Sequence, residues 1–332
     1  MKSKKVAIAV VIIALISIAM YFHFSNEKEK IVIFHAGSLS IPFEKVGKEF
    51  EKRYGINVLQ SPAGSIETIR KVTELGKRAD VVGSADYELI QKMMEPDYAD
   101  YCIEFATNRM VIAYTEKSRY GNEINESNWY KILNRKGVRF GFSDPNKDPC
   151  GYRSMMLLQL AELYYKNDSI FDELIEKNVG VVSEYENGSY IIKIPDSMQL
   201  KSNDKIVIRP MEVELMASLE TGEIDYLFIY QSVASQHGVR FLNLPPEIDL
   251  SSEINYSVEV ELHSGKVVKA KPIIYGVTIP KNAPHKNLAI KFLQFMLSEN
   301  GKKLLEESGL NVMDARCDNK DLLPPSIKQY VK

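Results

Sequence analysis

The sequence has 332 residues, enough for two ordinary domains, and its 45% apolar and 26% charged residues are typical of a folded globular protein. This profile excludes a disordered or fibrous chain. The 42 Lys and Arg residues are balanced by 44 Asp and Glu residues, for a formal net charge of −2, so no positive excess is available to neutralise phosphates and we expect no nucleic-acid partner.

The first segment of the chain differs from the rest. Three lysines among the first five residues precede an uninterrupted apolar run from Val6 to about Phe22, which is typical of an export signal or a membrane anchor rather than a buried core helix. The run of roughly 17 residues is long for a signal and short for a membrane span, and no clear cleavage site follows it. We therefore predict that 1–25 is a signal peptide or membrane anchor, with cleavage left open, and that the rest lies outside the cytoplasm.

Beyond this segment, short apolar runs alternate with amphipathic helical patterns, which predicts an α/β fold with largely parallel sheets. In each unit a strand is followed by a short polar loop and a helix. The predicted strands are 31–34, 56–59, 80–83, 138–142, 206–208 and 226–230, and the longest predicted helix is 152–165.

Two of the loops at strand ends pair glycine with serine, as Gly37-Ser38 and Gly64-Ser65. Such loops bind small ligands because the helix N-termini beside them offer unpaired N–H groups. Glycine lets the backbone approach a ligand closely, and serine adds a hydroxyl donor. Either pair alone is weak evidence, and for a single pair a serine that merely caps a helix is the favoured interpretation.

Six segments, taken together and in order, carry a resemblance to a known family. They are HAGSLSIPFEKVGKEFE, PAGSIETIRKV, ADVVGSADY, SDPNKDPCGYR, RPMEVELMASLETGEIDYLFIYQSVA and AIKFLQFMLSENGKKLL. The chain resembles the extracytoplasmic substrate-binding proteins of ABC importers, specifically the archaeal-type molybdate/tungstate-binding proteins. The resemblance runs from about residue 31 to residue 313.

The resemblance implies a two-lobed, periplasmic-binding-protein-like fold of type II, with a ligand cleft between two α/β lobes. We place one lobe at 31–108 plus 272–332 and the other at 109–271. The implied function is to capture tungstate or molybdate and deliver it to a membrane permease with its ATPase. The implied protein is a monomer without a cofactor, associated with the membrane through its first segment or through the permease.

The resemblance also implies a ligand site, in which Asp148 and Glu212 reach the metal centre of the oxyanion. Carboxylates pointed at a dianion are otherwise repulsive, whereas molybdenum(VI) and tungsten(VI) are oxophilic and accept further oxygen ligands. Sulfur and phosphorus do not expand in this way, so the same carboxylates would reject sulfate and phosphate. The full set of implied ligand-binding residues is Gly37, Ser38, Ser65, Asp148, Pro149, Cys150, Glu212 and Tyr230.

Several neighbours compete with these residues. Asp144 is the local rival of Asp148, and Glu214 is the local rival of Glu212. Ser84 is a reserve candidate for a serine contact. Tyr230 ends an apolar strand, so a role in the core is its alternative.

Arg153 is the cation nearest to the site in the sequence. We expect it to orient Asp148 rather than to touch the ligand. The three cysteines, Cys102, Cys150 and Cys317, are too widely spaced for a disulfide framework or a CxxC-type zinc site. Pairing of Cys102 with Cys150 is one open arrangement in an oxidising exterior.

Two other functions remain to be weighed. A receptor for sulfate or phosphate is the alternative among binding proteins. An exported α/β hydrolase is the alternative of another class, but the sequence has neither a G-x-S-x-G nor an H-E-x-x-H motif and contains only five histidines. The only candidate catalytic residues for a hydrolase are His35, beside Gly37-Ser38, and the lone Cys150. We therefore expect that the protein is not an enzyme.

Overall fold

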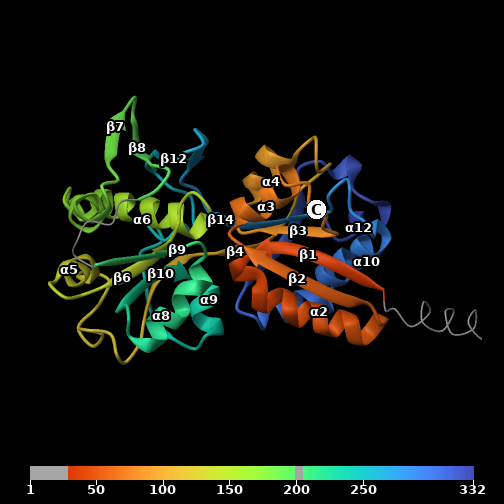
Figure 1. Ribbon diagram of the computed structural model, residues 1–332, viewed down its shortest axis with the longest axis horizontal. Helices are drawn as coiled ribbons and strands as arrows, with labels where there is room; N and C mark the ends of the chain where they lie inside the picture. Colours follow the sequence, from red (N-terminus) through yellow and green to blue (C-terminus); the bar gives the residue numbers. More distant parts are fainter. Residues whose placement is uncertain (1–28, 199–204) are drawn as a thin grey trace, which may run out of the picture.

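The computed structural model describes residues 29–198 and 205–332 and folds them into two α/β lobes (Figure 1). The predicted signal or anchor segment, 1–25, lies outside these described residues. Within the described ranges, no helix combines the length and apolar character that crossing a membrane requires.

The first lobe is built on a six-stranded sheet with the strand order β15-β4-β14-β3-β1-β2. Its strands are β1 (Lys30–Ala36), β2 (Asn57–Ala63), β3 (Val81–Ser84), β4 (Ile103–Asn108), β14 (Ile273–Thr278) and β15 (Asn311–Cys317). Its helices are η1 (Gly37–Leu39), α2 (Ser40–Tyr54), α3 (Ser65–Thr73), α4 (Tyr87–Met94), α10 (Lys286–Leu297), α11 (Glu299–Glu306), η4 (Lys320–Leu322) and α12 (Pro325–Lys328).

The second lobe is built on a five-stranded sheet with the order β11-β5-β10-β6-β9. Its strands are β5 (Met110–Tyr114), β6 (Phe140–Ser143), β9 (Ile206–Arg209), β10 (Tyr226–Tyr230) and β11 (Arg240–Asn243). Its helices are α5 (Trp129–Asn134), α6 (Pro149–Tyr165), η2 (Asp172–Glu176), α7 (Lys177–Val179), η3 (Glu212–Glu214), α8 (Leu215–Thr221) and α9 (Gln231–Gln236).

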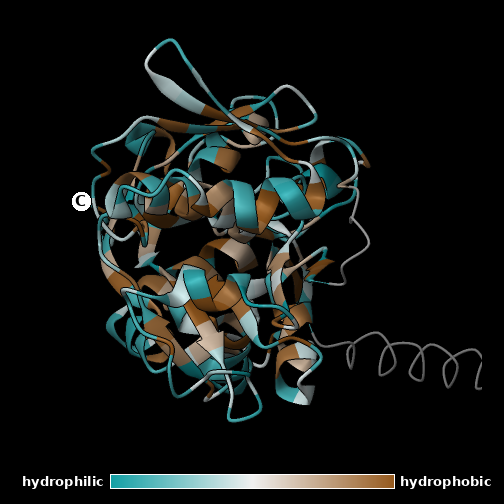
Figure 2. Cartoon of the chain, turned by 90° about the vertical axis from the view of Figure 1, so that its left-hand side faces the viewer, coloured by the Kyte–Doolittle hydropathy of each residue, from teal (hydrophilic) through white to brown (hydrophobic). Residues whose placement is uncertain are grey.

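A smaller four-stranded sheet, β13-β12-β8-β7, completes the second lobe. Its strands are β7 (Ser183–Glu186), β8 (Ser189–Lys193), β12 (Val258–Glu261) and β13 (Val267–Lys269). Helix α6 contacts β8 and β12 of this small sheet as well as β5, β6 and β10 of the large one. It is therefore enclosed from two sides, and 14 of its 17 residues are buried. Figure 2 shows how hydrophilic and hydrophobic residues are distributed over the helices and strands of the chain.

The α/β prediction is confirmed, and each of the six predicted strands overlaps an observed one. The expectation of largely parallel sheets is wrong, because both large sheets are mixed. Strand β1 pairs in parallel with β2 and β3, whereas β14 pairs antiparallel with both β3 and β4. Parallel pairs arise where a helix connects successive strands, and the antiparallel pairs form where the chain enters or returns from the other lobe.

The chain leaves the first sheet where β4 ends at Asn108 and rejoins it where β14 begins at Ile273. These strand memberships support the lobe bounds predicted from the sequence, which stay a prediction. Asn108 is nearly buried at the first crossing, and its Nδ2 donates to Ser232 Oγ at 2.7 Å and to Tyr275 OH at 2.9 Å. One side chain thus ties the crossing to α9 and β14.

We predict that Asn108→Ala lowers the free energy of unfolding by about 2 kcal/mol, because it leaves two buried hydroxyls without their donor. Chemical denaturation of the full chain measures this change. Asn243→Ala, at an exposed position at the end of β11, is the control and should cost less than about 0.5 kcal/mol. Equal losses in the two variants would contradict the role given to Asn108.

Candidate functional site

The predicted site residues lie where strands of the two lobes end and helices begin. Gly37 follows β1 and Ser65 follows β2, while Glu212 follows β9 and Tyr230 ends β10. Asp148 precedes α6, in the loop after β6. The turns η1 and η3, from opposite lobes, contact each other, so the structure brings these segments together.

Asp148 and Glu212 form the centre of this site, each only 1% exposed. Asp148 is the N-cap residue of α6: its Oδ1 accepts from the Cys150 N–H at 3.5 Å, and its Oδ2 accepts from the Glu212 N–H at 3.2 Å. Pro149 occupies the start of α6, where a missing N–H costs no helical hydrogen bond. The fixed start of α6 therefore sets the position of the Asp148 carboxylate.

The environment of the two carboxylates disfavours their charged forms. Burial raises the pKa of Asp148 above its ordinary value. Burial and then the negative charge of Asp148 raise the pKa of Glu212 well above its ordinary value. Two such groups are stable together only if they share a proton or face an electron-poor centre.

Several buried polar atoms at the site have no hydrogen-bond partner among the described residues. They are Ser38 Oγ, Ser143 Oγ and both carboxylate oxygens of Glu212. The Ser38 hydroxyl lies beside Glu212, and the Ser143 hydroxyl lies beside Asp148. Because buried polar groups are nearly always paired, we take this cluster of hydroxyls and carboxylate oxygens as the candidate ligand site.

Two glycines allow the lobes to meet this closely. A Cβ on Gly37 would lie 3.3 Å from Glu212 Oε2, and a Cβ on Gly64 would lie 2.3 Å from the Lys147 carbonyl oxygen. The second distance is too short for any side chain. At both Gly-Ser loops the near neighbour is therefore the opposite lobe, and the close approach to a ligand stays a prediction.

The serines of these loops do not cap helices. No side chain caps η1, α2 or α3. Instead, Ser65 Oγ accepts from the Ala85 N–H at 3.0 Å, and Ser38 Oγ stays unpaired among the described residues. The alternative that both serines are simple N-caps is therefore wrong.

The local rivals of the site residues have other environments. Asp144 is partly exposed and pairs with Lys147 at 3.4 Å, and Glu214 is exposed. Ser84 Oγ donates to the Asp86 carbonyl oxygen at 2.6 Å, which uses it in a local turn. Burial thus favours Asp148 over Asp144, while their roles toward a ligand stay predictions.

Arg153 differs from its expected role. Its Nη1 donates to Tyr230 OH at 2.8 Å and to the Ala85 carbonyl oxygen at 2.7 Å, and its Nη2 lies 3.4 Å from Asp86 Oδ2. These contacts of the guanidinium lead to Tyr230 and to the opposite lobe. The expectation that Arg153 orients Asp148 is replaced by this bridging position.

Two site residues were missed by the sequence analysis. Ser143 ends β6 at the site, and the signal that could have found it is a polar residue closing a buried strand, as in the Gly-Ser loops. Tyr275 of β14 packs its ring 6.2 Å from that of Tyr230 and lies beside Ser38. The sequence around Tyr275 contains no motif that predicts a site residue. Tyr275 reaches the site only because the chain returns to the first sheet through β14.

The candidates for catalysis have structural surroundings. His35 is fully buried, its Nδ1 donates to the Ala36 carbonyl oxygen at 2.8 Å, and burial lowers its pKa to about 4. Cys150 is buried with its thiol 3.7 Å from the Phe228 carbonyl oxygen. All three cysteines are free, so the Cys102–Cys150 pairing is not formed. Over 29–198 and 205–332, no cluster of three or more His, Cys, Asp or Glu residues could hold a metal ion.

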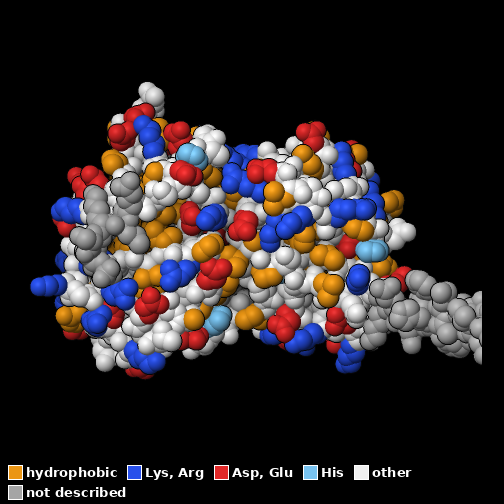
Figure 3. Space-filling model, in the orientation of Figure 1, with side chains coloured by type: hydrophobic (Ala, Val, Ile, Leu, Met, Phe, Trp, Pro, Cys, Tyr) orange, Lys and Arg blue, Asp and Glu red, His pale blue; other side chains and the backbone are white. Residues whose placement is uncertain are grey.

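The surface offers no general attraction for an anion. Figure 3 shows Lys and Arg side chains interspersed with Asp and Glu over the visible face, in keeping with the net charge of −2. An anion bound by this chain therefore has to be held by local donors, as at the buried site.

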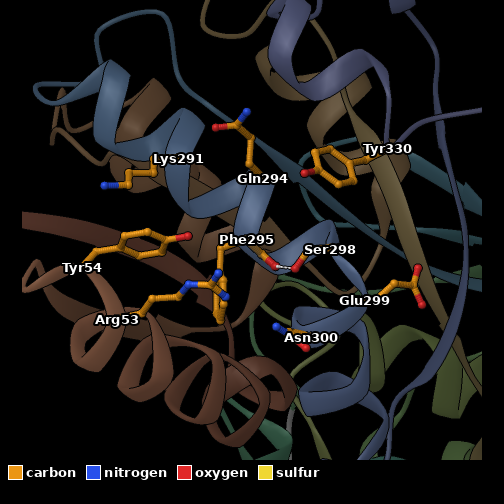
Figure 4. Close-up of a pocket in the computed structure, with 9 residues that line it drawn as sticks. All are labelled: Arg53, Tyr54, Lys291, Gln294, Phe295, Ser298, Glu299, Asn300 and Tyr330. Carbon is orange, nitrogen blue, oxygen red and sulfur yellow. Dashed lines mark hydrogen bonds between the residues drawn. The ribbon is translucent and has the colours of Figure 1, made fainter.

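A separate pocket of about 550 Å³ lies in the first lobe between α2, α10, α11 and the C-terminal residues (Figure 4). Lys291 Nζ lies 4.1 Å from the centre of the Tyr54 ring, and Ser298 Oγ donates to the Phe295 carbonyl oxygen at 2.6 Å. None of the predicted site residues lines it. The residues that do are Arg53, Tyr54, Lys291, Gln294, Phe295, Ser298, Glu299, Asn300 and Tyr330.

Comparison with known proteins adds an independent line of evidence. The family described as bacterial extracellular solute-binding protein matches residues 31–311. The molybdate/tungstate-binding protein WtpA of Thermococcus kodakarensis is 48% identical over 298 residues, which cover 86% of this chain and 82% of that protein. The protein of the same name from Pyrococcus abyssi is 48% identical over 292 residues. These residues cover 84% of this chain and 83% of the Pyrococcus protein.

Solved structures with low sequence identity share the fold. The periplasmic molybdate-binding protein of Azotobacter vinelandii has a TM-score of 0.61 and 16% identity, covering 84% of this chain and 98% of that chain. The sulfate-binding protein SubI of Mycobacterium tuberculosis H37Rv has a TM-score of 0.59 and 14% identity, covering 86% and 88%. These similarities confirm the predicted two-lobed, periplasmic-binding-protein-like fold and, at such identity, concern the fold alone.

We predict that Glu212→Gln stabilises the ligand-free protein at neutral pH, because an amide needs neither a charge nor a bound proton in the buried place beside Asp148. A carboxyl group whose pKa is raised by folding binds its proton more tightly in the folded state, so its contribution falls as pH rises above its unfolded pKa of about 4.3. The gain should therefore be small near pH 4 and reach about 3 °C or more in Tm at pH 7.5, the shift expected for about 1 kcal/mol.

Differential scanning calorimetry across this pH range measures the difference. Glu214→Gln is the matched control, since it makes the same change two residues away at an exposed position. A Glu212→Gln protein that melts below the parent at pH 7.5 would show that the buried carboxylate stabilises the fold, contrary to the argument above.

Proposed function

Because the chain belongs to the bacterial extracellular solute-binding protein family, we propose that it binds tungstate and molybdate outside the cytoplasm. The resemblance noted in the six sequence segments is confirmed by the relatives that match most of the chain. The protein is a binding protein rather than an enzyme, and the oxyanion is its cargo rather than a cofactor.

The observation that carries this proposal is the chemistry of the unpaired groups. The hydroxyls of Ser38 and Ser143 are donors suited to the oxygens of an oxyanion, whereas the Glu212 oxygens are acceptors, which an anion's oxygens repel. One ligand satisfies both sets if its oxygens meet the hydroxyls and its central atom meets the carboxylates. Tungsten(VI) and molybdenum(VI) are hard, oxophilic centres that accept additional oxygen ligands.

We assign the contacts accordingly. Asp148 and Glu212 approach the metal centre from the second lobe, while the serine hydroxyls, the Tyr230 phenol and backbone N–H groups at the helix starts bind the oxygens. Glycine at position 37 keeps this wall of the site free of side-chain atoms. The proposed ligand-binding residues are those implied by the resemblance, Gly37, Ser38, Ser65, Asp148, Pro149, Cys150, Glu212 and Tyr230, together with Ser143, which we add because its buried hydroxyl is unpaired among the described residues.

Sulfate and phosphate fit this site less well. Their central atoms do not take further oxygen ligands, so the two carboxylates would meet a dianion with repulsion alone. The fold shared with a sulfate-binding protein does not favour sulfate, because a fold is not evidence for the ligand it holds.

The cargo is handed to a membrane transporter in this proposal. The chain delivers the oxyanion, as a monomer, to the permease of an ABC importer that works with a cytoplasmic ATPase. The segment 1–25 directs export and either remains as an anchor at the outer face of the membrane or is removed. The lobes, 31–108 plus 272–332 and 109–271, close on the anion because donors from both must converge on one small ligand.

We predict that the full chain binds tungstate and molybdate at least about 100-fold more tightly than sulfate or phosphate, a difference of about 2.7 kcal/mol. The physical reason is that only the metal centres gain bonds to the carboxylates. Calorimetric titration with the four anions in parallel measures the difference. Equal affinity for sulfate and tungstate would refute the coordination argument.

We further predict that Glu212→Gln weakens tungstate binding by about 3 kcal/mol or more, because an amide is a poorer, neutral donor to the metal centre. Rejection of sulfate should relax in the same variant, while Glu214→Gln should bind like the parent. If the carboxylates merely crowd the pocket, removal of a negative charge strengthens the binding of every dianion instead. Titration of the two variants with tungstate therefore separates the coordination model from the crowding model. Glu212→Gln weakens tungstate binding in the first model and strengthens it in the second.

A further inference from the structure

The first turns of α6 reach beyond the candidate site to the opposite lobe. Tyr152 OH donates to Asp86 Oδ2 at 2.6 Å, and Arg153 Nη2 lies 3.4 Å from the same oxygen. Asp86 belongs to the first lobe, where it is the N-cap residue of α4 and accepts from the Glu88 N–H at 3.1 Å. All three interlobe side chains are nearly or fully buried, at 0 to 2% exposure.

The charges at this contact are compensated. Burial alone would raise the pKa of Asp86, but the Arg153 guanidinium and the Lys271 ammonium outweigh it and lower the pKa to about 2. Lys271 Nζ lies 3.2 Å from Asp86 Oδ1 and 2.8 Å from Glu88 Oε1. Asp86 is therefore an ionised group held between a cation of the second lobe and a cation at the return crossing.

Arg153 also links two of the proposed ligand-binding residues. On one side its Nη1 donates to Tyr230 OH at 2.8 Å. On the other side the same atom donates to the Ala85 carbonyl oxygen at 2.7 Å, and the Ala85 N–H donates to Ser65 Oγ at 3.0 Å. Tyr230 and Ser65, from opposite lobes, are thus joined through one guanidinium and one residue of backbone.

We propose that Asp86, Tyr152 and Arg153 form a latch that holds the two lobes together and sets the rate at which the bound oxyanion leaves. The inference rests on the proposed function, because the latch orients Ser65 and Tyr230. Its members do not touch the anion, and Asp86 and Arg153 are positioning residues.

The latch can open without leaving bare charges. Lys271 lies at the boundary of the two lobes, two residues before β14. The short connection to β14 therefore keeps Lys271 near Asp86 when the lobes part, and Arg153 keeps its bond to Tyr230. Removing the charge of either Asp86 or Arg153 raises the free energy of the closed state more than that of the open state. In the closed state the remaining charge is then buried without its partner. Loss of the latch therefore shifts the balance toward the open state and shortens the residence of the ligand.

Asp86→Asn is the main variant, because asparagine still caps α4 while the charge is lost. Tyr152→Phe removes only the hydroxyl bonded to Asp86, and Arg153→Lys keeps the charge but loses the planar fork that reaches three partners. The matched control is Asp225→Asn: Asp225 is 3% exposed and pairs with Arg119 Nη1 at 2.9 Å within the second lobe. It tests the loss of an ion pair that has a buried carboxylate but does not join the lobes.

The experiment measures tungstate release from the full chain, in detergent, by a chase with excess molybdate and elemental analysis of the protein-bound tungsten. Hydrogen exchange supplies a second readout, because the Ile66 N–H donates to the Lys147 carbonyl oxygen at 3.2 Å across the lobes. We expect Asp86→Asn and Arg153→Lys to release tungstate tenfold or more faster and Tyr152→Phe several-fold faster, with faster exchange at Ile66. Asp225→Asn should lower Tm and leave the release rate within about twofold of the parent.

Release at the parental rate from the folded latch variants would overturn the proposal, as would equal acceleration in Asp225→Asn. If Asp86→Asn does not fold, Tyr152→Phe and Arg153→Lys decide the question. If the parent binds no tungstate, the proposed function fails, and exchange at Ile66 in the ligand-free proteins still tests the latch. In that case, faster exchange in the latch variants alone supports it, and unchanged exchange refutes it.

Discussion

The burial of Asp148 beside Glu212 is the constraint on which the rest of the site depends. Two carboxylates in a buried place cannot both stay charged at low cost, and the pKa of each is raised. The Glu212 N–H and the start of α6 position Asp148, yet the Glu212 oxygens stay unpaired among the described residues. The arrangement is therefore unfavourable by itself and becomes favourable when an electron-poor centre lies between the carboxylates.

Helix α6 connects this local chemistry to the movement of whole lobes. Its N-terminus carries Asp148 at the site, its next turn carries Tyr152 and Arg153 to the other lobe, and its body is packed between two sheets. A helix enclosed in this way has little freedom to shift alone. In our proposal, ligand contact and lobe contact are therefore coupled through one rigid element. Gly64 allows the same approach from the other side, because any side chain there would collide with the Lys147 carbonyl oxygen.

The shared fold leaves the choice of anion to a few side chains. Proteins named for molybdate and for sulfate both superpose on most of this chain at low sequence identity. Donor groups at helix starts are available to any oxyanion in such a fold. In the site that we propose, the pair of acidic side chains among those donors selects for a central atom that accepts further oxygen ligands.

The sequence by itself determined the α/β units and the strand ends that carry the candidate loops, because apolar periodicity and short motifs express local burial and backbone geometry. The candidate residues Asp148 and Glu212 came from the family resemblance of the segments that contain them. Only the tertiary structure decided that Asp148 is buried while Asp144 is not, that the serines of the Gly-Ser loops are not N-caps, and that Arg153 bridges to Asp86. It also decided the mixed sheets and the position of Tyr275. These features depend on contacts between segments that are far apart in the chain. The free energy of such contacts arises from packing within and between the two lobes, so neither segment shows it as a periodic pattern in its own sequence.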